Sequence, residues 1–238
     1  MNLRTLAAYA FFGMALAIWP AWATADATPV EVTTSYQILK GGLLIGTVDE
    51  KFTRANDSYK ITSDTRTAGG LSLLLRERIT VSAEGKIGTA GLEPALYEFR
   101  RQGNGAKNIS ARFDWNVHQI FSQQSSRSES FELPAGTMDR ISAMYQFMFN
   151  APRDSRVHTW VSNGKQAELY HYRKKGEPTL QVGSQLLATV HYERESEPGR
   201  PRAQLWLAKD HHYLPVRAIF EDSHGMSLEQ TLVQFQVR

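Results

Sequence analysis

The chain has 238 residues, of which 42% are hydrophobic and 21% are charged, and its formal net charge is +3. This composition is typical of a globular protein and excludes a disordered or fibrous one. The chain has no cysteine, so it forms no disulfide and lacks the residue that is acylated in lipoproteins.

The first residues have the pattern of a secretory signal peptide. Arg4 supplies a positive charge, and residues 6–18 form an apolar run that is short for a bilayer span. Two small-residue patterns follow this run, Ala21-Trp22-Ala23 and Ala23-Thr24-Ala25. The second pattern is the preferred cleavage site.

We therefore expect residues 1–25 to be a signal peptide and residues 26–238 to form a single β-rich domain. An uncleaved membrane anchor is the alternative. No later apolar run is long enough to span a membrane, so we expect no transmembrane segment after signal removal. Export without disulfides fits a bacterial periplasm, where we expect no nucleic-acid partner.

From residue 30 to residue 121 the sequence predicts strands joined by tight turns. The strand runs are rich in β-branched and aromatic residues, and Gly, Asn and Asp mark the turns. Alternation is clearest over residues 107–115, where Ile109, Ala111, Phe113 and Trp115 share one face. One face of the sheet is therefore expected to be buried and the other wet.

An apolar tip interrupts these strands after Gly69-Gly70. Leu71, Leu73, Leu74 and Leu75 follow the two glycines. The tip is interpreted either as a short buried segment or as an apolar flap at the mouth of the sheet that meets a lipid or a partner.

The stretch 133–149 is the one convincing helix of the mature chain. Thr137 is predicted to cap its start, and Asp139 to place negative charge near the positive helix end. Its apolar stripe is expected either to fill the core of a curved sheet or to cover an apolar cavity. The stripe comprises Ile141, Met144, Tyr145 and Met148.

Beyond residue 152 the chain returns to strands. Asn163-Gly164 is a strong signal for a β-hairpin, and the apolar face of the last strand changes near Thr231 and Leu232, which predicts a β-bulge. The whole pattern predicts a mainly β fold, an antiparallel meander that forms an open or closed barrel or a strongly curved sheet with one central α-helix.

Two segments resemble the DUF3108 family of exported bacterial proteins. They are Asp139-Arg140-Ile141-Ser142-Ala143-Met144-Tyr145 and, after it, Leu205-Trp206-Leu207-Ala208-Lys209-Asp210-His211-His212-Tyr213-Leu214-Pro215-Val216-Arg217. The resemblance covers nearly all of the mature chain. It implies an envelope protein, mostly β, similar in shape to periplasmic lipoprotein carriers whose open barrel is covered by helices. The function of the family is unknown, and this chain has one helix in place of several lid helices.

No motif of the sequence marks an enzyme. The chain lacks a Gly-x-Ser-x-Gly elbow and a His-x-x-x-His pair, and the adjacent His211 and His212 would point to opposite faces of a strand. We therefore predict no catalytic residue, no metal site and no cofactor. A hydrolase assembled from distant strands is kept as a third hypothesis.

The first hypothesis is a periplasmic, non-enzymatic binding protein for an apolar or amphiphilic envelope molecule, a lipid or a glycolipid. The predicted ligand-binding residues are Met144, Tyr145, Met148 and Trp206. Two further aromatic side chains, Trp115 and Trp160, are candidates for stacking on a sugar or an acyl chain. The alternative hypothesis is a protein-interaction scaffold in envelope assembly, which uses an edge strand or the apolar tip to hold an envelope protein.

Overall fold

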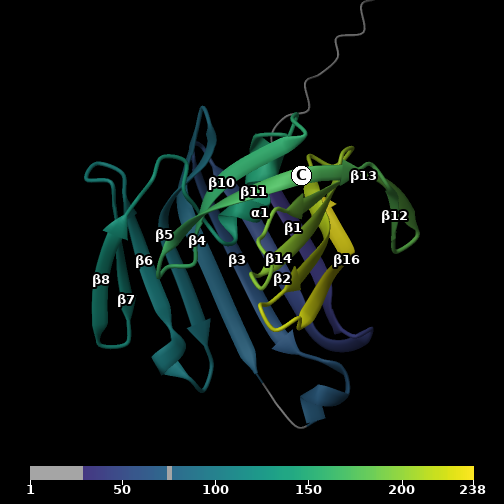
Figure 1. The fold of residues 1–238 in the computed structure, drawn as a ribbon, viewed down its shortest axis with the longest axis horizontal. Coiled ribbons are helices and arrows are strands. Elements are labelled where there is room, and N and C mark those ends of the chain that lie inside the picture. The colour runs from purple at the N-terminus through teal and green to yellow at the C-terminus, as the bar shows by residue number, and fades with distance from the viewer. Residues whose placement is uncertain (1–28, 74–76) are drawn as a thin grey trace, which may run out of the picture.

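A computed structural model describes residues 29–73 and 77–238 (Figure 1). The predicted signal peptide lies outside these residues. Sixteen strands form one sheet, and its strand order is β8-β7-β6-β5-β4-β3-β2-β1-β16-β15-β14-β13-β11-β10-β9, with β12 paired to β13. The path starts at β8 and ends at β9, so the sheet is open. The predicted mainly β fold with a strongly curved, open sheet and one α-helix is therefore confirmed.

The strands of the first half are β1 (Glu31–Lys40), β2 (Leu43–Ala55), β3 (Ser58–Thr67), β4 (Arg78–Gly88), β5 (Gly91–Arg101), β6 (Ile109–Asp114), β7 (Gln119–Gln124) and β8 (Arg127–Glu132). The second half contains β9 (Met138–Asp139), β10 (Arg156–Ser162), β11 (Ala167–Gly176), β12 (Thr179–Val182), β13 (Gln185–Arg194), β14 (Arg202–Ala208), β15 (Leu214–Glu221) and β16 (Ser227–Val237). The helix α1 is Ser142–Phe149, and two short 3₁₀-helices are η1 (Gly69–Leu73) and η2 (Gly105–Lys107).

Alternate side chains of each strand build the core on the concave face of the sheet. Val48 and Phe52 of β2 and Ile61 of β3 are buried there, and they pack with Tyr145 and Met148 of the helix. Because successive side chains of a strand point to opposite faces, the residues between them form the polar outer face. Figure 1 shows β10 and β11 crossing in front of α1, with the broad wall of β2–β8 beside it.

The end of the sheet curls back against its own concave face. The β10–β11 hairpin places its turn at Gly164, whose carbonyl accepts a hydrogen bond from the Ser122 hydroxyl of β7. Gly164 has a φ of +80°, and a Cβ there would lie 2.7 Å from Cγ2 of Ile109. Glycine is therefore required both by the turn and by this close contact.

The helix is shorter than predicted, because its first turns are replaced by a loop and a strand. The Thr137 hydroxyl donates to the Pro134 carbonyl at 2.7 Å and does not cap the helix. Asp139 performs that role instead, because its Oδ1 accepts from the N–H groups of Ile141 at 3.0 Å and Ser142 at 2.9 Å. The helix therefore begins at Ser142, and the predicted position of Asp139 near its positive end is confirmed.

Two other local predictions have clear outcomes. The β1–β16 pairing shifts between Ser35 and Tyr36, which oppose Gln234 and Leu232, so Val233 is the extra residue of a bulge in β16 as predicted. In the apolar tip, the backbone of Leu71 and Leu73 belongs to η1, while their side chains and residues 74–76 lie outside the described part of the chain.

Within residues 29–73 and 77–238, no helix combines the length and the apolar character needed to cross a bilayer.

Candidate functional site

A cavity of about 450 Å³ lies beside α1. Its walls come from segments far apart in the sequence: the β4–β5 turn, the end of β6, the loop before β9, one side of α1, and β10. The lining residues are Gly88, Thr89, Ala90, Gly91, Leu92, Glu93, Trp115, Ala135, Gly136, Met138, Ala143, Gln146, Phe147, Asn150, Val157, His158, Thr159 and Trp160. A volume of this size is in the range of ligand-binding pockets.

The walls of this cavity are mainly apolar and aromatic. Leu92, Met138 and Phe147 are buried and form its floor. Trp115 and Trp160 are half-buried at its sides. The Trp115 indole N–H donates to the Pro94 carbonyl at 2.7 Å, which fixes the ring and leaves its faces for packing. The cavity therefore offers aromatic surfaces to an apolar ligand group.

A hydrogen-bond clamp holds the β4–β5 turn against the helix. Gln146 accepts from the N–H of Leu92 through Oε1 at 2.8 Å, and its Nε2 donates to the Ala90 carbonyl at 2.8 Å. Gly91 lies between them, and a Cβ at Gly91 would come within 2.5 Å of the Gln146 amide. This wall is therefore set by α1 rather than by the turn alone.

Two carboxyl groups anchor the helix, Asp139, which is buried, and Glu50, which is half-buried. Asp139 is fully buried, and its Oδ2 accepts from the Ser142 hydroxyl at 2.6 Å, while Ser142 in turn lies 2.9 Å from Tyr59 Oη. Burial raises the pKa of Asp139 to about 6, more than its hydrogen bonds lower it. Glu50 accepts from Tyr145 Oη at 3.1 Å.

Glu50 receives a second hydrogen bond, from Ser63 Oγ at 3.2 Å. Burial raises the pKa of Glu50 to about 7, and its two hydrogen bonds only partly oppose this effect. Glu50 lies opposite Thr34 on β1, whose hydroxyl is buried without a partner among the described residues. The hydrogen bonds of Glu50 thus tie β2 and β3 to the helix.

None of the four predicted ligand-binding residues lines the cavity beside α1, and Tyr145, Met148 and Trp206 instead belong to one cluster of buried apolar residues. Tyr145 and Met148 are buried in the core against β2, and Met144 is half-buried beside both of the clusters that the helix contacts. Trp206 is buried on β14, where its ring stacks on His191 with centroids 4.1 Å apart and lies beneath the Arg217 guanidinium. The cavity instead adjoins the opposite side of α1, and ligand contact by the four residues stays a prediction.

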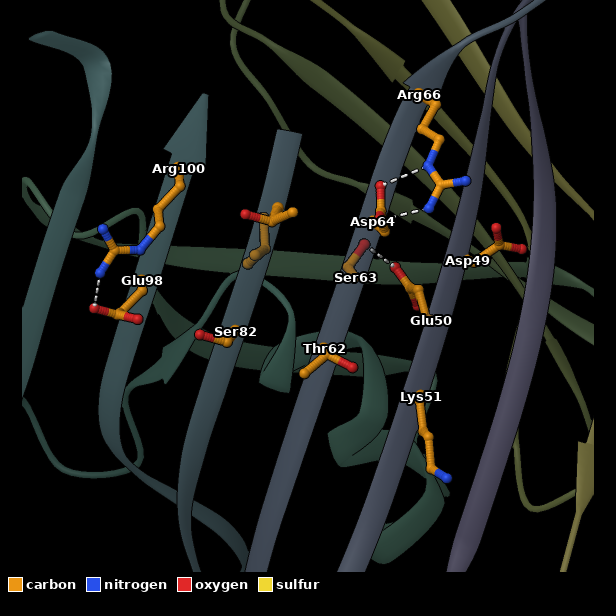
Figure 2. A pocket seen from close by; sticks show the side chains of 12 residues that line it. Asp49, Glu50, Lys51, Thr62, Ser63, Asp64, Arg66, Ser82, Glu98 and Arg100 are labelled. Carbon is orange, nitrogen blue, oxygen red and sulfur yellow. Dashed lines mark hydrogen bonds and ion pairs between the residues drawn. The ribbon is translucent and has the colours of Figure 1, made fainter. Parts of the chain in front are cut away.

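A second hollow, of about 500 Å³, lies on the polar outer face of β2–β5. Figure 2 shows Asp64 paired with Arg66, and Glu98 paired with Arg100. Arg78 also pairs with Asp64, and the two arginines lower the pKa of Asp64 to about 2. Asp64 and Glu98 are thus already paired with arginines of the same face and are not free to bind a ligand. This favours the cavity beside α1 as the candidate site.

Among residues 29–73 and 77–238, no group of three or more His, Asp or Glu side chains is placed to hold a metal ion. His158 and His171 face each other across β10 and β11, with ring centroids 6.3 Å apart.

The family profile described as protein of unknown function (DUF3108) matches residues 32–233. The chain belongs to the DUF3108 family. No curated protein matches it at a significant level.

Comparison with solved structures gives a fold likeness for this DUF3108 chain at a TM-score above 0.5 and further matches at lower scores. A β-barrel-like protein of the domain of unknown function DUF1849 from Brucella abortus has 11% sequence identity and a TM-score of 0.56, and the match covers 88% of this chain and 98% of that one. A protein described as exported with a YmcC-like fold, from Bacteroides fragilis, has 9% identity and a TM-score of 0.38 over 87% and 96% of the two chains. A protein described as a lipoprotein, from Parabacteroides distasonis, has 7% identity and a TM-score of 0.38 over 88% and 96%.

Sequence reasoning named two members of the cavity and missed the rest. Trp115 and Trp160 were candidates for ligand stacking, and the structure brings both to the cavity beside α1. Gln146 and Met138 carried no signal of their own. Gly91 is the one hint in the sequence of the Gln146 clamp, because a glycine indicates a position where a side chain does not fit. In the structure it has a φ of +106° and leaves room for the Gln146 amide.

Proposed function

We propose that this DUF3108 chain is a periplasmic, non-enzymatic binding protein for an apolar or amphiphilic molecule of the cell envelope, a lipid or a glycolipid. In this proposal residues 1–25 are removed on export and residues 26–238 form one binding domain. The cavity beside α1 holds the apolar part of the ligand.

The observation that carries this proposal is the pair of tryptophans at the cavity. Trp115 and Trp160 are half-buried, and they border a cavity whose floor consists of buried apolar side chains. An acyl chain that leaves water for such a site gains about 0.8 kcal/mol for each buried methylene. Polar groups at the rim, among them Glu93 and Asn150, would remain in contact with the polar part of an amphiphile.

Intrinsic fluorescence tests this proposal. In residues 26–238 the tryptophans are Trp115, Trp160 and Trp206, so a Trp206→Phe variant reports from the cavity alone. Titration with dodecanoic acid and with dodecyl maltoside should give a saturable change in its emission. No change with either amphiphile would refute binding in the cavity.

A pair of matched variants adds a control. Ala135 is exposed in the cavity wall, and Ala135→Phe should obstruct the cavity and weaken binding at least tenfold. Ala106 is exposed in η2 and outside the cavity, so Ala106→Phe should bind as the parent protein does. Equal binding by both variants would place the ligand elsewhere.

The predicted ligand contact of Met144, Tyr145, Met148 and Trp206 can be tested in the same assay. If it is correct, Met144→Ala weakens amphiphile binding more than Ala135→Phe does. The alternative hypothesis of a protein-interaction scaffold is tested by crosslinking in the periplasm.

A further inference from the structure

The strand that borders the cavity has an unpaired edge. β10 pairs with β11 along its whole length, from Arg156 to Ser162. On its other side it pairs with β9 at Val161 and Ser162 only. Between Arg156 and Trp160, β10 is therefore the inner edge of the sheet.

The hydrogen-bond pattern shows which main-chain groups are free there. The N–H of Lys174 donates to the Ser155 carbonyl at 2.8 Å, and the N–H of Asn163 donates to the Gln166 carbonyl at 3.3 Å. These bonds mark hydrogen-bonded pairs at the two ends of the hairpin, and such pairs alternate with non-hydrogen-bonded pairs along an antiparallel ladder.

Arg156 and His158 fall in the non-hydrogen-bonded pairs, opposite Arg173 and His171. Their N–H and C=O groups point away from β11. Among the described residues, no partner outside the ladder is found for these four groups. An unpaired strand edge of this kind is a template for another extended chain.

This edge opens into the cavity. Four consecutive residues, Val157 to Trp160, line the cavity although their side chains alternate between the two faces of β10. A strand that lines a cavity with both faces presents its edge to it. Across the cavity lie Trp115 and the apolar floor of Leu92 and Phe147. The cavity thus combines main-chain hydrogen-bonding groups with an apolar compartment.

We propose that the ligand is an acylated peptide, an amphiphile whose polar part is an extended peptide main chain. Its amides pair with the N–H and C=O groups of Arg156 and His158, and its acyl chain occupies the cavity between Trp115 and Trp160. This inference deepens the proposed function and rests on it. The hydrogen-bonding edge favours a peptide over a sugar, because successive amides match the spacing of a strand.

Proline substitution at the edge tests the main-chain contacts. His158→Pro removes the N–H that points into the cavity and leaves the ladder to β11 intact, since proline is tolerated at an unpaired strand edge. The probe is N-dodecanoyl-tetraalanine amide, titrated against the Trp206→Phe protein. We expect His158→Pro to weaken its binding about tenfold, the effect of losing one or two hydrogen bonds. His158→Ala, which keeps the N–H, should lose less.

A matched proline control lies on the other edge of the sheet. In β8, Ser130 opposes Phe121 in a non-hydrogen-bonded pair, because the N–H of Leu133 donates to the His118 carbonyl at 2.9 Å and the pairs alternate from there. Ser130→Pro therefore also removes an outward N–H, but outside the cavity. It should bind the probe as the parent protein does.

Modified probes keep the test valid even if His158→Pro fails to fold. Compared with N-dodecanoyl-tetraalanine amide, the same peptide with methylated main-chain nitrogens should bind the unaltered protein about tenfold more weakly. The peptide that carries an acetyl group in place of the dodecanoyl chain should lose most of the affinity. If dodecanoic acid binds as tightly as the acyl peptide and neither proline nor N-methylation matters, the peptide assignment is overturned and the proposed function stands. Equal binding of the acetylated peptide would overturn the acyl assignment. Failure of every probe would overturn both proposals.

Discussion

Replacement of Glu50 by Gln should flatten the pH dependence of stability. Glu50 is half-buried at the contact of β2 with α1, where it accepts hydrogen bonds from Tyr145 and Ser63. Burial raises its pKa from 4.5 to about 7. Burial raises the pKa values of Tyr36 of β1 and Tyr145 of the helix, and the nearby Glu50 charge raises both further.

The sign follows from proton linkage. The unfolded chain releases the Glu50 proton near pH 4.5, whereas the folded chain holds it until about pH 7. The stabilising contribution is therefore complete below pH 4.5 and is lost as the pH rises through 7. The interval corresponds to about 3 kcal/mol at 1.4 kcal/mol per pH unit. Because the side chain keeps some accessible surface, we expect about 2 kcal/mol.

Urea unfolding at pH 5, 6, 7 and 8 measures this effect. The wild-type free energy of unfolding should fall between pH 5 and pH 8, and that of Glu50→Gln should fall by about 2 kcal/mol less. The decline that remains belongs to Asp139, whose pKa of about 6 gives the same sign. Asp49→Asn is the matched control, because it makes the same acid-to-amide change at the exposed neighbour on the outer face. Parallel pH profiles for wild type and Glu50→Gln would refute the reasoning.

Three further substitutions test how the helix and the hairpin are held, each measured by urea unfolding. Gly164→Ala should lower the free energy of unfolding by about 2–4 kcal/mol, because the new Cβ would overlap Ile109 at a φ of +80°. Gly225→Ala is the control, because Gly225 has the same φ but lies in open space, and it should cost only about 1–2 kcal/mol. Equal losses for the two variants would contradict the contact with Ile109. Gln146→Ala should cost about 1–3 kcal/mol by freeing two main-chain groups of the β4–β5 turn, and an unchanged midpoint would show that the clamp contributes nothing. Asp139→Ala should cost about 2–3 kcal/mol through the lost cap and the buried groups it leaves unpaired, and a loss below 0.5 kcal/mol, of the order of a surface substitution, would contradict that role.

The fold class was accessible from sequence because it depends on local signals. Alternation over residues 107–115 and the Asn163-Gly164 turn act between near neighbours. The turn forms as predicted, and the alternating stretch forms the shorter strand β6, because residues 105–107 belong to η2. The predicted start of the helix was wrong because Thr137 and Asp139 are both residue types that cap helices well. The choice between them depends on the turn that Pro134 makes with Thr137, which composition does not reveal.

The cavity could not be predicted from the sequence in this way, because its walls meet only after the sheet has curled. Trp115 lies 45 positions before Trp160 in the chain, and nothing local indicates that they approach one cavity. The unpaired edge of β10 depends on β9 having only two residues. The second of them, Asp139, already accepts from the N–H of Ile141, so the chain turns into the helix there. Likewise, the apolar stripe of α1 correctly indicated a covered helix, but not which of its sides adjoins a cavity.

Native mass spectrometry of the mature protein, purified gently from a bacterial periplasm, tests ligand binding by the cavity most directly. Organic extraction of the same sample identifies any bound molecule, and Ala135→Phe, prepared in parallel, obstructs the cavity. The account predicts an added mass on the wild-type protein that Ala135→Phe loses and that extraction releases as an amphiphile. A clean unliganded mass for the wild-type protein, together with no binding of dodecanoic acid, dodecyl maltoside or the acyl peptide, would contradict it.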